Sequence, residues 1–135
     1  PLAGMPSVCP VDESVSHSVS SPSNTIKGLI TVFEASREAM QGRMALNLPG
    51  LNVTVKEMLQ ALEDVAGPAV RQHVTFVRDE HIAGIVANWA KAGSAQRAAA
   101  LGLKPDASFK EVIKQYIEDC KLPYYPPHAL DGLKK

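Results

Sequence analysis

The chain has 135 residues, of which 45% are hydrophobic, and its 14 Lys and Arg residues are balanced by 14 Asp and Glu residues. This length fits one domain with a core of its own. The even charge and the aromatic content of 5% argue against nucleic acid or a membrane surface as a partner, because those partners select basic patches and stacking rings. No apolar run approaches the roughly 20 residues that span a bilayer, and the N-terminal residues do not resemble a signal peptide. We therefore expect a cytoplasmic protein.

Cysteine and histidine usage points away from a metal centre. Cys9 and Cys120 lie far apart in the sequence, and two free thiols are the simpler interpretation in a cytosolic protein, although a disulfide stays open. The 4 histidines are scattered, without a Cys-x-x-Cys or His-Glu-x-x-His pattern. We predict no bound metal.

The first third of the chain predicts one helix between irregular segments. Residues 7–11 have weak strand character, and a proline restricts them to an edge position. The serine-rich stretch 12–20 predicts a loop. Ser21 is a candidate N-cap, because Pro22 follows at the first helical position, and the helix is expected to run to about Met40. Its apolar face is formed by Ile26, Leu29, Ile30 and Phe33.

The next stretch carries the strongest local signals. An apolar run, 44–48, predicts a short strand that stops at Pro49-Gly50. Thr54 and Glu57 then form a capping box, in which the hydroxyl accepts from the amide three residues on and the carboxylate reaches back. Apolar residues at helical spacing follow until Gly67 ends the helix. The stripe that we expect in the core is Met44, Met58 and Leu59.

The remainder of the chain is predicted to be mainly helical. The expected elements are a helical turn at 69–73, a strand at 74–77, a helix capped by Asp79 and broken at Ala92-Gly93, a short helix at 95–101 that Gly102 ends, and a final helix opened by a Ser108–Glu111 capping box. Strands this short do not make a stable sheet alone. We therefore expect them to add to the edge of a sheet supplied elsewhere.

Two parts of the chain resemble the extended short-chain dehydrogenase/reductase family. In that family a strand and a Gly-containing turn lead into a Ser/Thr-capped helix, and a later short helix ends in Leu-Gly-aromatic-x-Pro before a capped final helix. Residues 44–67 and 94–111 are similar to these two units, although Leu103 replaces the aromatic and Gly93-Ser94 stands where the family has Asp. The nearest group is the D-erythronate dehydrogenase-like enzymes, relatives of the nucleoside-diphosphate-sugar epimerases. The segments that match this group in order are Pro1 to Gly4, Pro10-Val11, His17, Ser21-Pro22 and Leu46 to Val55.

The resemblance implies an α/β fold in which this chain is a mostly helical C-terminal lobe, with two or three short strands, that completes a Rossmann-type NAD(P)-binding fold. Residues 1–121 would be the substrate-binding lobe and 122–135 an extended tail. The cofactor domain would lie in the longer protein, called the parent protein below, and would bind NAD or NADP. That N-terminal domain would be the partner of this lobe, and the parent can form a homodimer.

The chemical groups of the family are missing from this chain. It has no G-x-x-G-x-x-G or G-x-G-x-x-G turn to cradle a pyrophosphate. No tyrosine is followed by Lys at the fourth position, since those positions hold Cys120, His128 and Ala129. We therefore predict no catalytic and no cofactor-binding residue, and we expect the chain alone to be inactive.

The polar segment that opens the first helix is the predicted substrate site, because the family places this loop and helix beside the substrate cleft. An imidazole, hydroxyls and a helix N-terminus together suit a polyol or an acid. Each residue also has a purely structural interpretation: solvent-exposed loop, helix cap or, for the tryptophan, core. Ser23 stands where the related enzymes often carry Arg, which weakens the acid-substrate interpretation. The substrate-binding candidates are His17, Ser21, Asn24, Lys27 and Trp89.

The resemblance implies the substrate-binding portion of an NAD(P)-dependent oxidoreductase or sugar epimerase acting on a hydroxy acid or a sugar nucleotide. The alternative is a stand-alone, non-catalytic helical interaction module, which composition alone does not exclude. A Gly-rich turn and a Tyr-x-x-x-Lys motif in the parent protein would distinguish the two.

Overall fold

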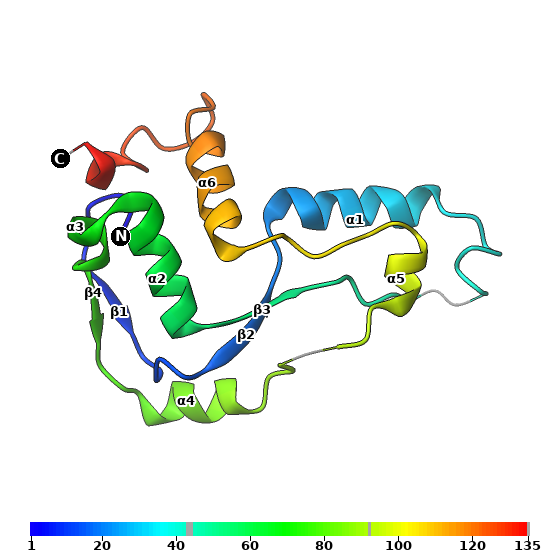
Figure 1. Cartoon of the computed structure of the whole chain (residues 1–135), viewed down its shortest axis with the longest axis horizontal. Coiled ribbons are helices and arrows are strands. Elements are labelled where there is room, and N and C mark those ends of the chain that lie inside the picture. Colours follow the sequence, from blue (N-terminus) through cyan, green and yellow to red (C-terminus); the bar gives the residue numbers. More distant parts are fainter. Residues whose placement is uncertain (43–44, 92, 135) are drawn as a thin grey trace.

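The computed structural model describes residues 1–42, 45–91 and 93–134. It has an α/β fold that is mostly helical with a few short strands, as the sequence predicts. Figure 1 shows a body built around α2, α6 and the short strands, from which α1 and α5 project as an arm. In chain order the elements are β1 (Ser7–Cys9), β2 (Ser16–Val19), α1 (Pro22–Glu34), β3 (Leu51–Thr54), α2 (Val55–Ala66), α3 (Pro68–Arg71), β4 (Val74–Phe76), α4 (Glu80–Ala87), α5 (Gln96–Ala100), α6 (Phe109–Asp119) and the 3-10 helix η1 (Asp131–Leu133).

The strands form two separate two-stranded sheets. Strand β1 pairs in parallel with β4, with Ser7 opposite Val74, and β2 pairs antiparallel with β3, with Ser16 opposite Thr54. Sheets of this size are marginal by themselves, so the helices that pack on them hold them in place. No helix in the described part of the chain is long and apolar enough to cross a membrane.

The predictions for β2 and β3 were wrong in position. The serine-rich stretch predicted to be a loop contains β2, because pairing with β3 overrides the local turn preference of serine. The strand predicted at 44–48 is not formed by residues 45–48, and Met44 lies outside the described residues. The strand follows Pro49-Gly50 instead, and Gly50 allows its backbone to approach closely, because a Cβ there would collide with the hydroxyl of Ser18.

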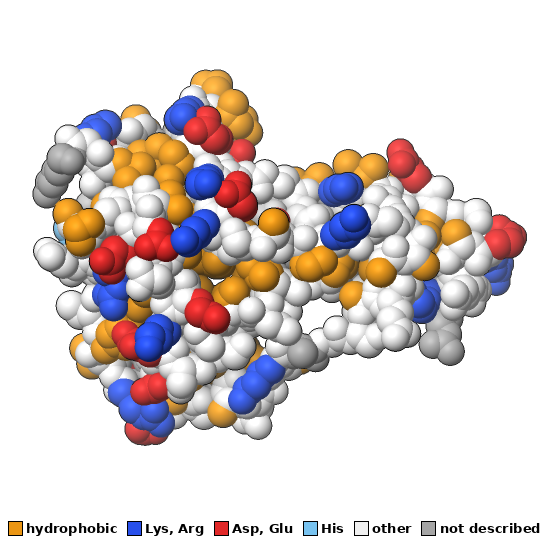
Figure 2. Space-filling model, in the orientation of Figure 1, with side chains coloured by type: hydrophobic (Ala, Val, Ile, Leu, Met, Phe, Trp, Pro, Cys, Tyr) orange, Lys and Arg blue, Asp and Glu red, His pale blue; other side chains and the backbone are white. Residues whose placement is uncertain are grey.

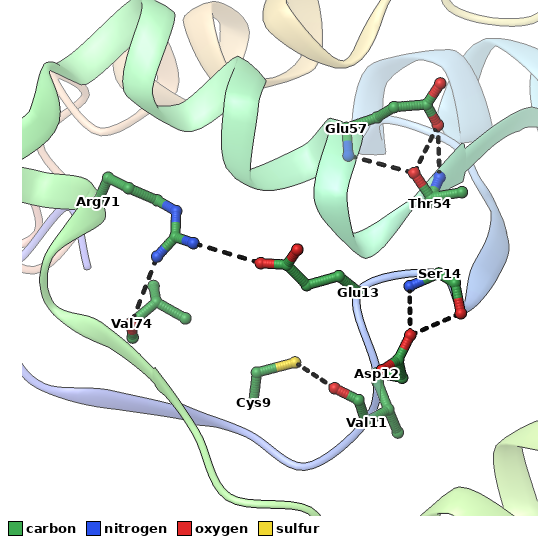
Figure 3. Close-up of polar contacts among 9 residues, drawn as sticks. All are labelled: Cys9, Val11, Asp12, Glu13, Ser14, Thr54, Glu57, Arg71 and Val74. Carbon is green, nitrogen blue, oxygen red and sulfur yellow. Dashed lines mark hydrogen bonds and ion pairs between the residues drawn. The ribbon is translucent and has the colours of Figure 1, made fainter.

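The N-terminus of α2 is fully capped, as the sequence predicts. The hydroxyl of Thr54 accepts from the amide of Glu57 at 3.2 Å, and the amide of Thr54 donates to the Glu57 carboxylate at 2.7 Å (Figure 3). The two preceding helical amides, of Val55 and Lys56, donate to carbonyl oxygens of the β1–β2 loop, both at 2.9 Å. The hydrogen bonds that the Glu57 carboxylate accepts from Thr54 hold the pKa of Glu57 below its ordinary value. The first turn of α2 therefore has its free amides satisfied within the chain.

Two predicted helix ends and one predicted capping box differ from the structure. Helix α1 ends at Glu34 rather than near Met40, and the chain then turns through residues with positive φ at Gln41 and Gly42. Helix α4 ends at Ala87, so Trp89 follows the helix instead of lying on its face. The second capping box is only half formed, since Ser108 caps α6 but the Glu111 carboxylate pairs with Lys114.

The core lies between α2, α3 and α6, with a smaller cluster around Val11, Val55 and Val86. Met58 and Leu59, predicted to be core, are partly buried. The C-terminal segment, predicted to be extended, instead folds into turns and η1, where Leu133 packs against the main cluster. The thiols of Cys9 and Cys120 are both free in the structure.

Candidate substrate-binding site

Two of the predicted site residues, His17 and Trp89, lie against each other although they are distant in the sequence. Their ring centroids are 6.0 Å apart, and the rings meet edge to face at 69°. His17 is opposite Val53 in the β2–β3 register, so their side chains share one face of that sheet. Trp89 remains 57% exposed and is therefore not a core residue. The imidazole forms no hydrogen bond with a described residue, so its ring nitrogens are free to bond a ligand hydroxyl.

Helix α4 places Trp89 beside β2. Asp79 caps this helix by accepting from the amide of Ile82 at 3.0 Å, as the sequence predicts. At its other end, the amide of Trp89 donates to the carbonyl of Val86, a buried residue of the smaller core cluster. The indole ring is therefore held by a capped helix whose inner face is packed. Nearby Arg78 pairs with Glu80 rather than with Asp79, and this contact lowers the pKa of the Glu80 carboxyl.

Ser21 is the N-cap of α1 and is tied to a residue that the sequence analysis did not single out. It is only 1% exposed. Its hydroxyl donates to one oxygen of Asp106 at 2.7 Å, and its amide donates to the other oxygen at 2.8 Å. The same hydroxyl accepts from the amide of Asn24 at 3.2 Å. The carboxylate of Asp106 thus occupies the N-terminus of α1, where an acidic ligand was expected.

The residues next to Asp106 in the sequence indicate no more than a turn. A Lys-Pro-Asp sequence is typical of a turn, and no local pattern reveals that the carboxylate caps a helix 85 positions away in the chain. Only the fold brings the two segments together.

The remaining two candidates are placed differently. The side-chain amide of Asn24 donates to the carbonyl of Lys104 at 2.9 Å, which fastens α1 to the loop before α6. A further hydrogen bond, from the side-chain amide of Gln115 to the hydroxyl of Ser23 at 2.5 Å, fastens α1 to α6 itself. Lys27 is exposed and pairs with no carboxylate in the described part of the chain. Ser21 and Asn24 therefore position α1, while His17, Trp89 and Lys27 keep free polar or aromatic surface.

Helix α1 has one packed face and one bare face. Gly28 is buried against Leu48, whose side-chain methyl carbons would lie 2.8 and 2.9 Å from a Cβ added to the glycine. The opposite face carries Phe33, which is 91% exposed. The other members of this face are Ile26, Leu29 and Ile30, each more than half exposed at 56%, 63% and 52%. This is a large apolar stripe to leave in water.

The described residues contain no group of three His, Cys, Asp or Glu side chains that could hold a metal ion. Two strand-to-helix junctions, those that open α1 and α2, are poorly suited to a pyrophosphate. At the start of α2 the amides already donate to carbonyl and hydroxyl oxygens, and at the start of α1 a carboxylate would repel the ligand.

Comparison with known proteins gives a consistent result. No family model matches the chain. It is 42% identical over 122 residues to a D-erythronate dehydrogenase from Cupriavidus necator, covering 90% of this chain, and 40% identical over 118 residues to a D-erythronate dehydrogenase from Haemophilus influenzae, covering 87%. The solved structure of a nucleoside-diphosphate-sugar epimerase from Agrobacterium tumefaciens is 36% identical, with a TM-score of 0.83 over 87% of this chain and 34% of that one.

The chain spans 38% of the length of the two dehydrogenases that it matches. The sequence follows the two dehydrogenases, and the fold follows the epimerase, over almost the whole of the chain. The chain therefore belongs to the extended short-chain dehydrogenase/reductase family, in the group of the D-erythronate dehydrogenases and nucleoside-diphosphate-sugar epimerases, and corresponds to the C-terminal part of such a protein.

Proposed function

We propose that this chain is the substrate-binding part of an NAD(P)-dependent dehydrogenase that acts on a hydroxy acid related to erythronate. The observation that carries the proposal is the 42% identity to a D-erythronate dehydrogenase over 90% of the chain. The cofactor domain and the catalytic Tyr and Lys belong to another part of the parent protein. Hydride transfer takes place there, and this chain binds and orients the substrate.

Within the site, His17 and Trp89 contact the substrate. A four-carbon hydroxy acid has a carbon backbone that can lie against an indole ring and hydroxyls that can bond an imidazole. Lys27, which has no carboxylate partner among the described residues, supplies a positive charge for the acid group. Ser21 and Asn24 act indirectly, by holding the start of α1 in place.

The bare face of α1 is the contact surface for the cofactor domain. Ile26, Leu29, Ile30 and Phe33 recur at the spacing of one helical face. Beneath α1 the chain at 45–48 runs extended (Figure 1), and the amides of Leu46 and Leu48 donate to no acceptor within the described residues. A helix above an unpaired extended segment is what a parallel sheet needs at its edge. We therefore assign residues 22–42 and 45–48 the role of completing the sheet of the parent protein.

Steady-state kinetics of the parent enzyme tests the site. His17→Ala should lower kcat/KM for the hydroxy acid about tenfold, which corresponds to about 1.4 kcal/mol of lost transition-state binding. The KM for the dinucleotide should not change. His81→Ala is the matched control, because His81 is an exposed histidine of α4. Unchanged kinetics for His17→Ala and Trp89→Ala would show that the substrate binds elsewhere.

A stand-alone interaction module is not favoured. The relatives that share 42% and 40% identity with the chain are both dehydrogenases, and their matches cover 90% and 87% of the chain.

A further inference from the structure

A separate apolar groove of about 630 Å³ lies between α2, α6, the first residues of the chain and the C-terminal segment. Helix α2 contributes Met58 and Leu62, α6 contributes Phe109 and Tyr116, and Met5 lines the groove from the N-terminal segment. Figure 2 shows hydrophobic side chains gathered between α2, α6 and the C-terminal segment. Met5 is 64% exposed and Tyr116 is 42% exposed, so the described residues leave much of this lining uncovered.

The start of the chain is anchored beside this groove. Pro1 lines it, and the carbonyl oxygen of Pro1 accepts from the amide of Gly4 at 2.8 Å. The amide of Gly132, in η1, donates to the carbonyl of Leu2 at 2.9 Å. Gly132 is buried, and a Cβ added there would lie 2.8 Å from the carbonyl oxygens of Pro1 and Leu2. This close backbone contact fixes the point at which residues that precede Pro1 would reach this part of the molecule.

The lining does not suit a small polar ligand. Ligand sites combine apolar walls with several placed polar groups. The titratable side chains among the described lining residues are Tyr116 and His128, and the imidazole of His128 already pairs with Asp131 at 2.8 Å. The mostly apolar lining instead resembles a protein core that is open on one side. Helices α2 and α6, which form two of its walls, also pack together in the main core.

We propose that this groove is filled by the segment of the parent protein that immediately precedes Pro1, and that this segment packs large apolar side chains against α2 and α6. The proposal rests on the assignment of the chain to a longer parent, since the chain spans 38% of the length of its relatives. The seated segment covers Met58 and Tyr116 and extends the core around Leu62. This surface differs from the α1 face, which serves the cofactor domain.

Photo-crosslinking in the full-length parent protein tests the proposal. The photoreactive residue p-benzoylphenylalanine is placed at Met58, and in a second variant at Tyr116, where it replaces a side chain of similar shape. Gln60 is the matched control position, because it is exposed on α2 and does not line the groove. After irradiation, mass spectrometry of the digested monomer band identifies the crosslinked peptide. Dehydrogenase activity of each variant is measured before irradiation.

The expected result is a crosslink within one chain from Met58 and from Tyr116 to the peptide that directly precedes Pro1, with no such crosslink from Gln60. A crosslink to a second copy, to a remote segment of the cofactor domain, or to no peptide at all would overturn the proposal. Should one variant fail to fold, the other decides. If the variants keep dehydrogenase activity but their crosslinks map elsewhere, only the groove assignment is refuted. If the parent protein itself has no dehydrogenase activity, the proposed function is refuted.

Discussion

Asp106→Ala should destabilise the chain strongly, because it leaves two polar groups of a buried residue without partners. Ser21 is 1% exposed, and both its amide and its hydroxyl donate to Asp106, at 2.8 and 2.7 Å. Each unsatisfied buried donor costs about 1–3 kcal/mol, and the lost carboxylate at the N-terminus of α1 adds about 0.3–1 kcal/mol. We expect a loss of about 3 kcal/mol, or a fall in Tm on the order of 10 °C for a domain of this size.

The assay is urea unfolding followed by the fluorescence of Trp89, the single tryptophan of the chain, and by circular dichroism. Coinciding transitions from the two probes would establish that unfolding is two-state. Asp106→Asn retains one acceptor oxygen and should lose about half as much stability as Asp106→Ala. Asp64→Asn is the control, because Asp64 is exposed and its ion pair with Lys110 contributes about 0–1 kcal/mol. A loss for Asp106→Ala no larger than that of the control would refute the reasoning.

Three further predictions concern the capping box of α2 and the exposed apolar face of α1. Thr54→Ala should cost about 1 kcal/mol in urea unfolding, because α2 loses its N-cap; an unchanged midpoint would contradict this. The capping box holds the pKa of Glu57 below 4.5. The stability that the ionised Glu57 carboxylate adds to the fold is therefore fully present above pH 4.5, and it is lost as the pH falls through the lower pKa of the folded state. In Thr54→Ala the Glu57 pKa measured by NMR should therefore rise towards 4.5, and a pKa that does not move would refute the link. Phe33→Ser should leave the isolated chain within about 0.5 kcal/mol of its original stability but reduce its binding of a hydrophobic dye. In the parent protein it should cost about 1.5–3 kcal/mol if the cofactor domain buries Phe33 as we propose. If Phe33→Ser lowers the stability of the isolated chain and of the parent protein equally, the proposed contact between α1 and the cofactor domain is contradicted.

The helices could be predicted from the sequence because their signals are local. Thr54 and Glu57 are three residues apart, and so are the groups that cap α4 and α6. Apolar spacing along α1 likewise predicts which side chains share a face, although not that this face is bare. Each of these features is decided within one or two helical turns.

The strands and the cap partner of α1 depend on contacts that span the chain. Ser16 to Val19 become a strand because Leu51 to Thr54 lie opposite, and serine by itself favours turns. Asp106 reaches Ser21 only after the loop before α6 has folded against α1. For the site, the sequence suggested His17 and Trp89 separately, through the family resemblance, and their contact at 6.0 Å emerges only from the fold.

Calorimetric titration of NAD and NADP, into the 135-residue chain and into the parent protein in parallel, tests the central claim most directly. The account predicts saturable binding of at least one dinucleotide to the parent and none to the chain alone, because the amides at the start of α2 are already bonded and Asp106 occupies the start of α1. Micromolar binding of either dinucleotide to the chain alone would contradict the account, as would a parent protein that binds neither.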